Sequence, residues 1–201
     1  MKAKRTRLLD RRLQNRDARL FVVATEGERT EPDYFEDLQA RALVDRLRVK
    51  VVVAPPIEGR SAPEYVLGRL DEIARTYQLE TFDELWLVSD VDHHLPAKLA
   101  LICTMAGHKG YFVAISNPSF EVWLILHRAE LADRVTAGSS AQDAKRAWST
   151  LNAGLPPFER SDVEAAVRRA RALEGGAVDG WPQRVGSHVY RLVERILVPS
   201  G

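Results

Sequence analysis

The sequence predicts an α/β fold: a mostly parallel, Rossmann-like sheet flanked by helices, with a helical C-terminal extension. Two observations support this prediction. Short apolar segments alternate with amphipathic segments as far as residue 118, an order typical of parallel strands joined by right-handed crossover helices. Beyond that point helix signals predominate, so residues 119–201 are predicted to be all-helical.

The first strand is predicted over Leu20–Ala24, because the run LFVVA is apolar on both faces, as a buried parallel strand is. A helix is expected over about 31–46, since Pro32 suits a first helical turn and Asp33 complements the positive end of the helix dipole. Glu26 should therefore lie just past the carboxyl end of a strand, where open α/β sheets bind ligands.

The alternation continues along the chain. Three more strands are expected over 47–54, 84–89 and 110–115, with helices over 63–77, capped by Ser61, and 95–106, stopped by Gly107. In the C-terminal part, helices are expected over 120–131, 140–151, 161–174, where Ser161 and Glu164 suggest a capping box, and 186–198. The predicted organisation is a basic arm (1–19), an α/β domain (20–130) and a helical extension packed on it (131–201).

The composition is that of an ordinary globular protein. Of 201 residues, 45% are hydrophobic and 28% are charged. The single cysteine, Cys103, excludes an internal disulfide and fits a reducing compartment, so a cytoplasmic location is expected. No apolar run reaches the roughly 18 residues of a membrane span, so no association with a membrane is expected.

The charge of the chain is unevenly distributed. The net charge is +1, yet residues 1–20 contain eight Lys or Arg and two Asp, a net +6, which leaves about −5 for the remainder. A basic arm beside acidic strand ends suits a polyanionic substrate bridged by metal ions. A solvated, disordered terminus is the alternative.

An acidic pair follows the strand predicted over 84–89. In an extended segment, residues i and i+2 point the same way, so Asp90 and Asp92 can face one point. Two converging carboxylates repel each other unless a cation lies between them, and Mg²⁺, or Mn²⁺, is the natural candidate because it prefers carboxylate oxygens. The alternative is a solvated, helix-capping loop.

Several motifs resemble RloB-like proteins, which are grouped with the Toprim domains of topoisomerases, primases and related nucleases. They are EGERTEPDYF, LVSDVDHH and AISNPSFEVWLILH, between about Phe21 and His127, and less specifically the tail WPQRVGSHVYRLVERI. The resemblance implies a Toprim-like fold, in which Glu26 is similar to a general acid/base or metal ligand and Asp90 and Asp92 to the Mg²⁺ pair. Glu121 matches the S-x-E acid of the related nucleases.

The resemblance also implies a place in prokaryotic antiphage loci, often beside an ATPase partner. It puts topoisomerase or primase activity in doubt, because this chain has no tyrosine-bearing cleavage domain, zinc-ligand cysteines or priming machinery.

Other residues near these motifs have two interpretations each. Glu31 could reach a second metal or serve as a helix-start acid. Arg29 and Thr30 could hold a phosphate oxygen or form a structural turn. One of His93 and His94 is expected to face the site, where it could donate to a phosphate. Asn117 could bond locally or orient Glu121.

Aromatic residues are divided between core and site. Trp86, Trp123 and His127 are expected in the core. Trp148 and Trp181 could stack bases, although structural roles are favoured.

Two functions compete. The first is a Mg²⁺-dependent nuclease, with DNA or RNA entering along the basic arm and Arg29. The second is a non-catalytic module that binds an ATPase and nucleic acid, so the sequence leaves open whether the chain is an enzyme. A phosphotransferase is disfavoured because no G-x-x-x-x-G-K-[ST] loop is present. Whether the chain forms a homo-oligomer is also left open.

Overall fold

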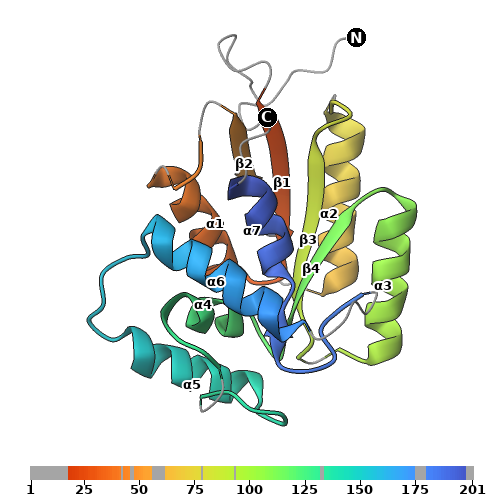
Figure 1. Ribbon diagram of the computed structural model, residues 1–201. Helices are drawn as coiled ribbons and strands as arrows, with labels where there is room; N and C mark the ends of the chain where they lie inside the picture. Colours follow the sequence, from red (N-terminus) through yellow and green to blue (C-terminus); the bar gives the residue numbers. More distant parts are fainter. Residues whose placement is uncertain are drawn as a thin grey trace. The chain divides into compact units, whose positions relative to one another are not determined.

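The computed structural model describes residues 18–41, 43–45, 48–55, 62–77, 79–92, 94–131, 134–174 and 180–197. Its strands form one sheet in the order β2-β1-β3-β4-β5, and strands alternate with helices in the N-terminal part (Figure 1). The predicted α/β fold is therefore confirmed. The elements are β1 (Arg19–Thr25), α1 (Thr30–Ala40), β2 (Val49–Val53), α2 (Pro63–Thr76), β3 (Glu84–Asp90), α3 (Pro96–His108), β4 (Phe112–Asn117), α4 (Glu121–Arg128), α5 (Ala141–Asn152), α6 (Arg160–Leu173), β5 (Gly186–Ser187) and α7 (Val189–Leu197).

The contacts within the chain divide it into two compact units. The first contains Met1–Val88, Met105–Phe112 and Ile196–Gly201, and the second contains Ser89–Thr104 and Val113–Arg195. Of the basic arm, residues 1–17 lie outside the described residues. Its last residue, Arg19, begins β1 and pairs with Glu84.

The first unit is built on parallel strand pairs. β1 pairs with β2 on one side and with β3 on the other, both in parallel. Phe21, Val22 and Val23 are fully buried, as expected for a central strand covered on both faces. Trp86 is also buried, as predicted, and its ring stacks on Phe112 with centroids 4.8 Å apart.

Helix α1 ends earlier than predicted, at Ala40 rather than near residue 46. After the helix, the amide of Leu43 donates to the carbonyl of Leu38 at 3.1 Å. The side-chain oxygen of Gln39 accepts from the amide of Val51 in β2 at 2.6 Å. The first of these hydrogen bonds is local to the helix end, and the second is tertiary and holds that end against β2. Together they end the helix although the local sequence favours its continuation.

Two further boundaries differ from the prediction. Gly107 does not end α3, which continues to His108, and Gly110 follows with a positive φ of 73°, a conformation that favours glycine. Strand β4 covers Phe112–Asn117 rather than 110–115.

The second unit has a helical core around α4, which contacts α5 and α6 (Figure 1). Trp123 is fully buried and His127 is 2% exposed, so both belong to the core as predicted. The His127 ring lies edge-on to Trp123, at 4.8 Å between centroids, and stacks on Phe158 at 4.2 Å. Trp148 also contacts Phe158, which supports the structural role favoured for it.

The prediction that residues 119–201 are all-helical is wrong, because Gly186–Ser187 form β5 and the terminal helix begins only at Val189. β5 pairs antiparallel with the end of β4. The Ser187 hydroxyl is 2.8 Å from that of Ser116, and the His188 amide donates to the Ile115 carbonyl at 2.9 Å. Such a short strand has no periodicity from which to predict it.

The cap of α6 also differs from the prediction. The helix begins at Arg160, with Glu159 as its N-cap. The carboxylate of Asp162 accepts from the Glu159 amide at 2.9 Å. This contact between the N-cap residue and the third residue of the helix is that of a capping box. The predicted pair of Ser161 and Glu164 is not the cap.

Among the described residues, none of the helices has the length and apolar character needed to cross a membrane.

Candidate active site at the strand ends

Glu26 lies in the turn that follows β1, as predicted. Its amide donates to the carbonyl of Val88 in β3 at 3.0 Å, which extends the pairing of the two strands by one residue. The Thr25 hydroxyl donates to the Gly27 carbonyl at 2.9 Å and tightens the turn. The Glu26 side chain is half-buried, so it is held by the sheet and still reaches solvent.

Glu31 is buried beneath this turn, with 6% of its surface exposed. One carboxylate oxygen accepts from the Gly27 amide at 3.2 Å. A Cβ atom at position 27 would overlap this carboxylate, so glycine allows the close approach. Glu31 thus supports the turn that presents Glu26, and a role in metal binding stays a prediction.

Arg29 and Thr30 are exposed at the start of α1, where Arg29 occupies the N-cap position without a capping side-chain hydrogen bond. Their side chains are accessible to a ligand in solution. The positive end of the helix dipole favours anions at this point. Phosphate binding by these two residues stays a prediction.

Sequence reasoning missed Arg69, a buried arginine on α2 that is 7% exposed. Its guanidinium donates to the main-chain carbonyls of Thr25, Ala54 and Pro55, at the carboxyl ends of β1 and β2. Burial lowers its pKa. A signal was present, because position 69 lies three residues after Val66 and four before Ile73, on the apolar face of the predicted helix.

In the second unit, the D-x-D segment is tied to the end of β4. The Val91 amide donates to the Ser116 carbonyl at 2.9 Å, and the Asp92 amide donates to the Pro118 carbonyl at 3.1 Å. Asp90 and Asp92 are both half-buried. The segment then turns, with the His94 amide donating to the Val91 carbonyl at 3.1 Å. His94 is half-buried, and His93 lies outside the described residues.

The S-x-E segment opens α4. The Ser119 hydroxyl donates to a carboxylate oxygen of Glu121 at 2.6 Å, and both residues are buried. Asn117 does not orient Glu121 in this structure. Its side-chain amide donates instead to the main-chain carbonyl of Pro182 at 2.9 Å. The predicted local hydrogen bond of Asn117 is therefore not the one observed, because its partner is distant in sequence. Substrate binding by Asn117 stays a prediction.

Asp90 and Asp92 belong to one segment of the second unit, and Glu121 belongs to another. Main-chain hydrogen bonds connect the two segments. Among the described residues, however, no three His, Cys, Asp or Glu side chains converge closely enough to hold a metal ion together. The metal site predicted from the sequence, with Asp90, Asp92, Glu121, Glu26 and Glu31, stays a prediction.

The alternating strands and helices, with acids at two strand ends, define an α/β protein with a candidate polar site. The sequence model of the RloB-like protein family matches residues 21–196, most of the chain, and the chain belongs to this family. No curated protein and no solved structure matched the chain in the comparisons.

Proposed function

We propose that this RloB-like protein is a Toprim-type, Mg²⁺-dependent nuclease, which hydrolyses phosphodiester bonds of DNA or RNA in prokaryotic antiphage defence, together with an ATPase partner. The observation that carries the proposal is the pair of main-chain hydrogen bonds from Val91 and Asp92 to Ser116 and Pro118. Through them, the D-x-D segment and the segment leading to Glu121 are fixed against each other.

The donor atoms of these acids suit Mg²⁺ or Mn²⁺. Mg²⁺ is a hard ion that proteins commonly hold with one or two carboxylates, while waters and substrate phosphates complete its coordination. Asp90 and Asp92 would hold the ion, with Glu121 in support. When bound, the ion would polarise a phosphoryl oxygen and lower the pKa of a bound water.

The other residues would act on the substrate directly. Glu26, half-buried in its turn, would accept or return a proton or contribute to a second metal. The exposed guanidinium of Arg29 would hold a phosphate oxygen by charge-assisted hydrogen bonds, with Thr30 beside it. His94, and the histidine before it, could donate to the scissile phosphate. The basic arm would draw the polyanion toward the site.

The proposal is tested with labelled single-stranded DNA, double-stranded DNA and transfer RNA, each incubated with the full chain and Mg²⁺ or Mn²⁺. Glu26→Gln and Asp90→Asn should each reduce the cleavage rate by about 10²-fold or more, with an unchanged circular dichroism spectrum. Glu28→Gln is the matched control, because Glu28 is an exposed acid two residues from Glu26. Undiminished cleavage by both active-site variants would reject the nuclease.

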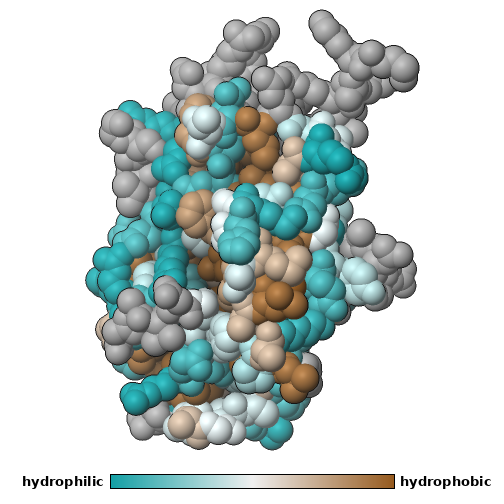
Figure 2. All heavy atoms as spheres, turned by 90° about the vertical axis from the view of Figure 1, so that its right-hand side faces the viewer, coloured by the Kyte–Doolittle hydropathy of each residue, from teal (hydrophilic) through white to brown (hydrophobic). Residues whose placement is uncertain are grey.

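One observation favours the alternative of a non-catalytic partner module. Leu101 and Met105, one helical turn apart on α3, are 58% and 40% exposed, and Leu95 just before the helix is 75% exposed. Figure 2 shows hydrophobic residues among hydrophilic ones at the surface of one face of the molecule. Exposed apolar patches often mark protein interaction sites. Nucleic-acid binding without Mg²⁺ or Mn²⁺ binding in calorimetry would support this alternative.

A further inference from the structure

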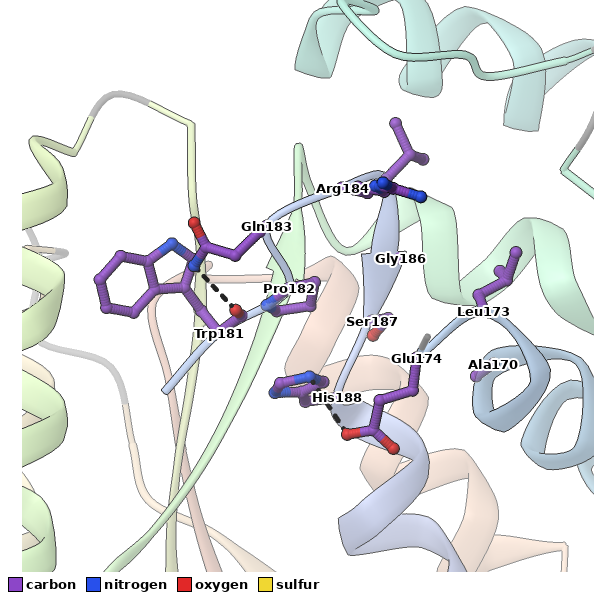
Figure 3. A pocket seen from close by; sticks show the side chains of 11 residues that line it. Ala170, Leu173, Glu174, Trp181, Pro182, Gln183, Arg184, Gly186, Ser187 and His188 are labelled. Atoms are coloured by element: carbon purple, nitrogen blue, oxygen red, sulfur yellow. Dashed lines mark hydrogen bonds and ion pairs between the residues drawn. The ribbon is translucent and has the colours of Figure 1, made fainter. Parts of the chain in front are cut away.

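The second unit contains a pocket of about 260 Å³ that the acids described above do not line. Pockets for drug-sized ligands are commonly about 300–1,000 Å³, so this volume suits a smaller group such as a single heterocycle. Figure 3 shows the pocket between the end of α6, the segment before β5, and the start of α7. Its lining residues are Ala170, Leu173, Glu174, Trp181, Pro182, Gln183, Arg184, Val185, Gly186, Ser187 and His188.

Part of the pocket wall is apolar. Ala170 and Leu173 contribute from α6, and Pro182 and Val185 contribute from the segment before β5. The half-buried Trp181 lies at one side, next to the Gln183 side chain (Figure 3). Such walls suit the flat, weakly polar faces of an aromatic heterocycle.

The polar part of the wall is a buried histidine beside a carboxylate. His188 is 4% exposed, and its Nε2 lies 3.5 Å from Glu174 Oε1 (Figure 3). Its Nδ1 is also buried, and the backbone of Gly180 lies within reach of the ring. The imidazole and the carboxylate together present hydrogen-bond donors and acceptors to the edge of a polar heterocycle.

The charges inside the pocket decide which part of a ligand enters. Burial lowers the pKa of His188, against the raising effects of the neighbouring Glu174 carboxylate and the backbone of Gly180, and so favours the neutral imidazole. The Glu174 carboxylate is paired with the Arg191 guanidinium and accepts a hydrogen bond from the Tyr190 hydroxyl. A paired carboxylate and a neutral ring suit the donor and acceptor edge of a base better than a phosphate group. Arg184, by contrast, is exposed and is free of that carboxylate, so it suits a phosphate outside the pocket.

The pocket is attached to the candidate active-site segment. Gly186 and Ser187 pair with Asn117 and Ser116, and the Asn117 side chain donates to the Pro182 carbonyl at 2.9 Å. The carbonyls of Ser116 and Pro118 accept from the D-x-D segment. One stretch, Ser116 to Pro118, therefore supports a wall of the pocket and the metal-binding segment proposed above.

We propose that this pocket takes one unpaired nucleobase, with the attached phosphate on the side of Arg184. The inference rests on the proposed nuclease function and names its substrate class: nucleic acid with single-stranded character. A base bound here would position the strand beside the D-x-D segment by stacking and edge contacts, as base-reading sites do.

The test measures binding in EDTA, without cleavage, by fluorescence anisotropy of two labelled hexamers. One carries bases, and the other carries the same phosphates on base-free sugars. We expect the base-containing strand to bind wild-type protein more tightly. Trp181→Ala should weaken that binding roughly 5- to 150-fold, the range for loss of one stacked base. His188→Gln should weaken it about 2- to 10-fold, the range for loss of one hydrogen bond, and inorganic phosphate should not compete.

Trp148→Ala is the matched control, because Trp148 is also half-buried but lies on α5 and does not line the pocket. Equal affinity of wild-type protein for the two strands, or unchanged affinity in both pocket variants at an unchanged melting temperature, would overturn the proposal.

The nuclease proposal and the pocket proposal can fail independently of each other. Pocket-dependent base binding without any cleavage would reject only the nuclease. Cleavage that depends on Asp90 with no base preference would reject only the pocket.

Discussion

The guanidinium of Arg69 donates to the main-chain carbonyl of Thr25, the residue directly before Glu26. Arg69 also donates to the carbonyls of Ala54 and Pro55, at 3.3 and 3.2 Å. A single buried cation thus joins the carboxyl ends of two parallel strands, where carbonyl groups no longer have ladder partners.

Replacing this arginine should destabilise the protein strongly. Arg69→Met should lower the free energy of unfolding by about 2–4 kcal/mol, because it leaves buried carbonyls without donors. Urea denaturation followed by circular dichroism measures the change. Arg75→Met is the matched control on the same helix, since Arg75 is exposed and its ion pair among the described residues is with the exposed Glu72. It should change the stability by less than about 0.5 kcal/mol, and equal effects of the two variants would contradict this role of Arg69.

The contact between Gly27 and Glu31 gives a second prediction. In Gly27→Ala, the new methyl group meets the end of the Glu31 side chain, which must move and give up its hydrogen bond with the Gly27 amide, so we expect a loss of about 0.5–1.5 kcal/mol. In a Glu31→Ala background the collision is absent, and the same substitution should be nearly neutral. Chemical denaturation of the four proteins in this cycle measures the coupling.

Gly68→Ala on α2 serves as the control, since open space surrounds position 68. It should stabilise the protein by about 0.4–1 kcal/mol, through the reduced entropy of the unfolded chain. Additive effects of Gly27→Ala and Glu31→Ala would show that the two residues do not interact.

The sequence predicted most of the strands because their signal is local. β1 and β3 are largely apolar and buried, Glu26 follows β1, and Asp90 is the last residue of β3. β5 escaped prediction because two residues carry no periodicity, and only its pairing with β4 makes Gly186 a strand residue. Likewise, the end of α1 depends on contacts of Gln39 with β2, which a local pattern does not contain.

The candidate site was predictable to a similar extent. The chain itself shows that Glu26, Asp90 and Asp92 follow strands. It does not show that Asp92 bonds to Pro118, or that Asn117 holds Pro182 and hence the wall of a pocket. These hydrogen bonds join residues far apart in sequence, so they need the tertiary structure.

His127 should make the stability depend on pH. Burial lowers its pKa to about 3, despite the hydrogen bond with the Trp123 carbonyl. An unfolded histidine titrates near 6.5, so below that pH the unfolded state binds a proton that the folded state excludes. Folding stability is therefore retained above about pH 6.5 and falls as the pH decreases toward 3, by about 1–2 kcal/mol at pH 5.

The measurement compares urea denaturation at pH 7.5 and pH 5 for the wild type and for His127→Phe. The variant should lose this part of the pH dependence, since it removes the titrating group and keeps an aromatic ring between Trp123 and Phe158. If both proteins lose the same stability between the two pH values, His127 is not responsible.

The hydrogen bond between Ser119 and Glu121 predicts how metal binding should respond to substitution. Asp92→Asn should abolish detectable Mn²⁺ binding in calorimetry, because it removes a charge from the proposed ligand pair. Glu121→Gln keeps an acceptor for the Ser119 hydroxyl but removes the charge, so the Kd for Mn²⁺ should rise by about 10- to 100-fold, the range for residues that support metal ligands. Glu130→Gln is the control, because Glu130 is exposed and its ion pair is with Arg169. An unchanged Kd in Glu121→Gln would remove Glu121 from the metal site and leave its buried carboxylate with the structural role that Ser119 already indicates.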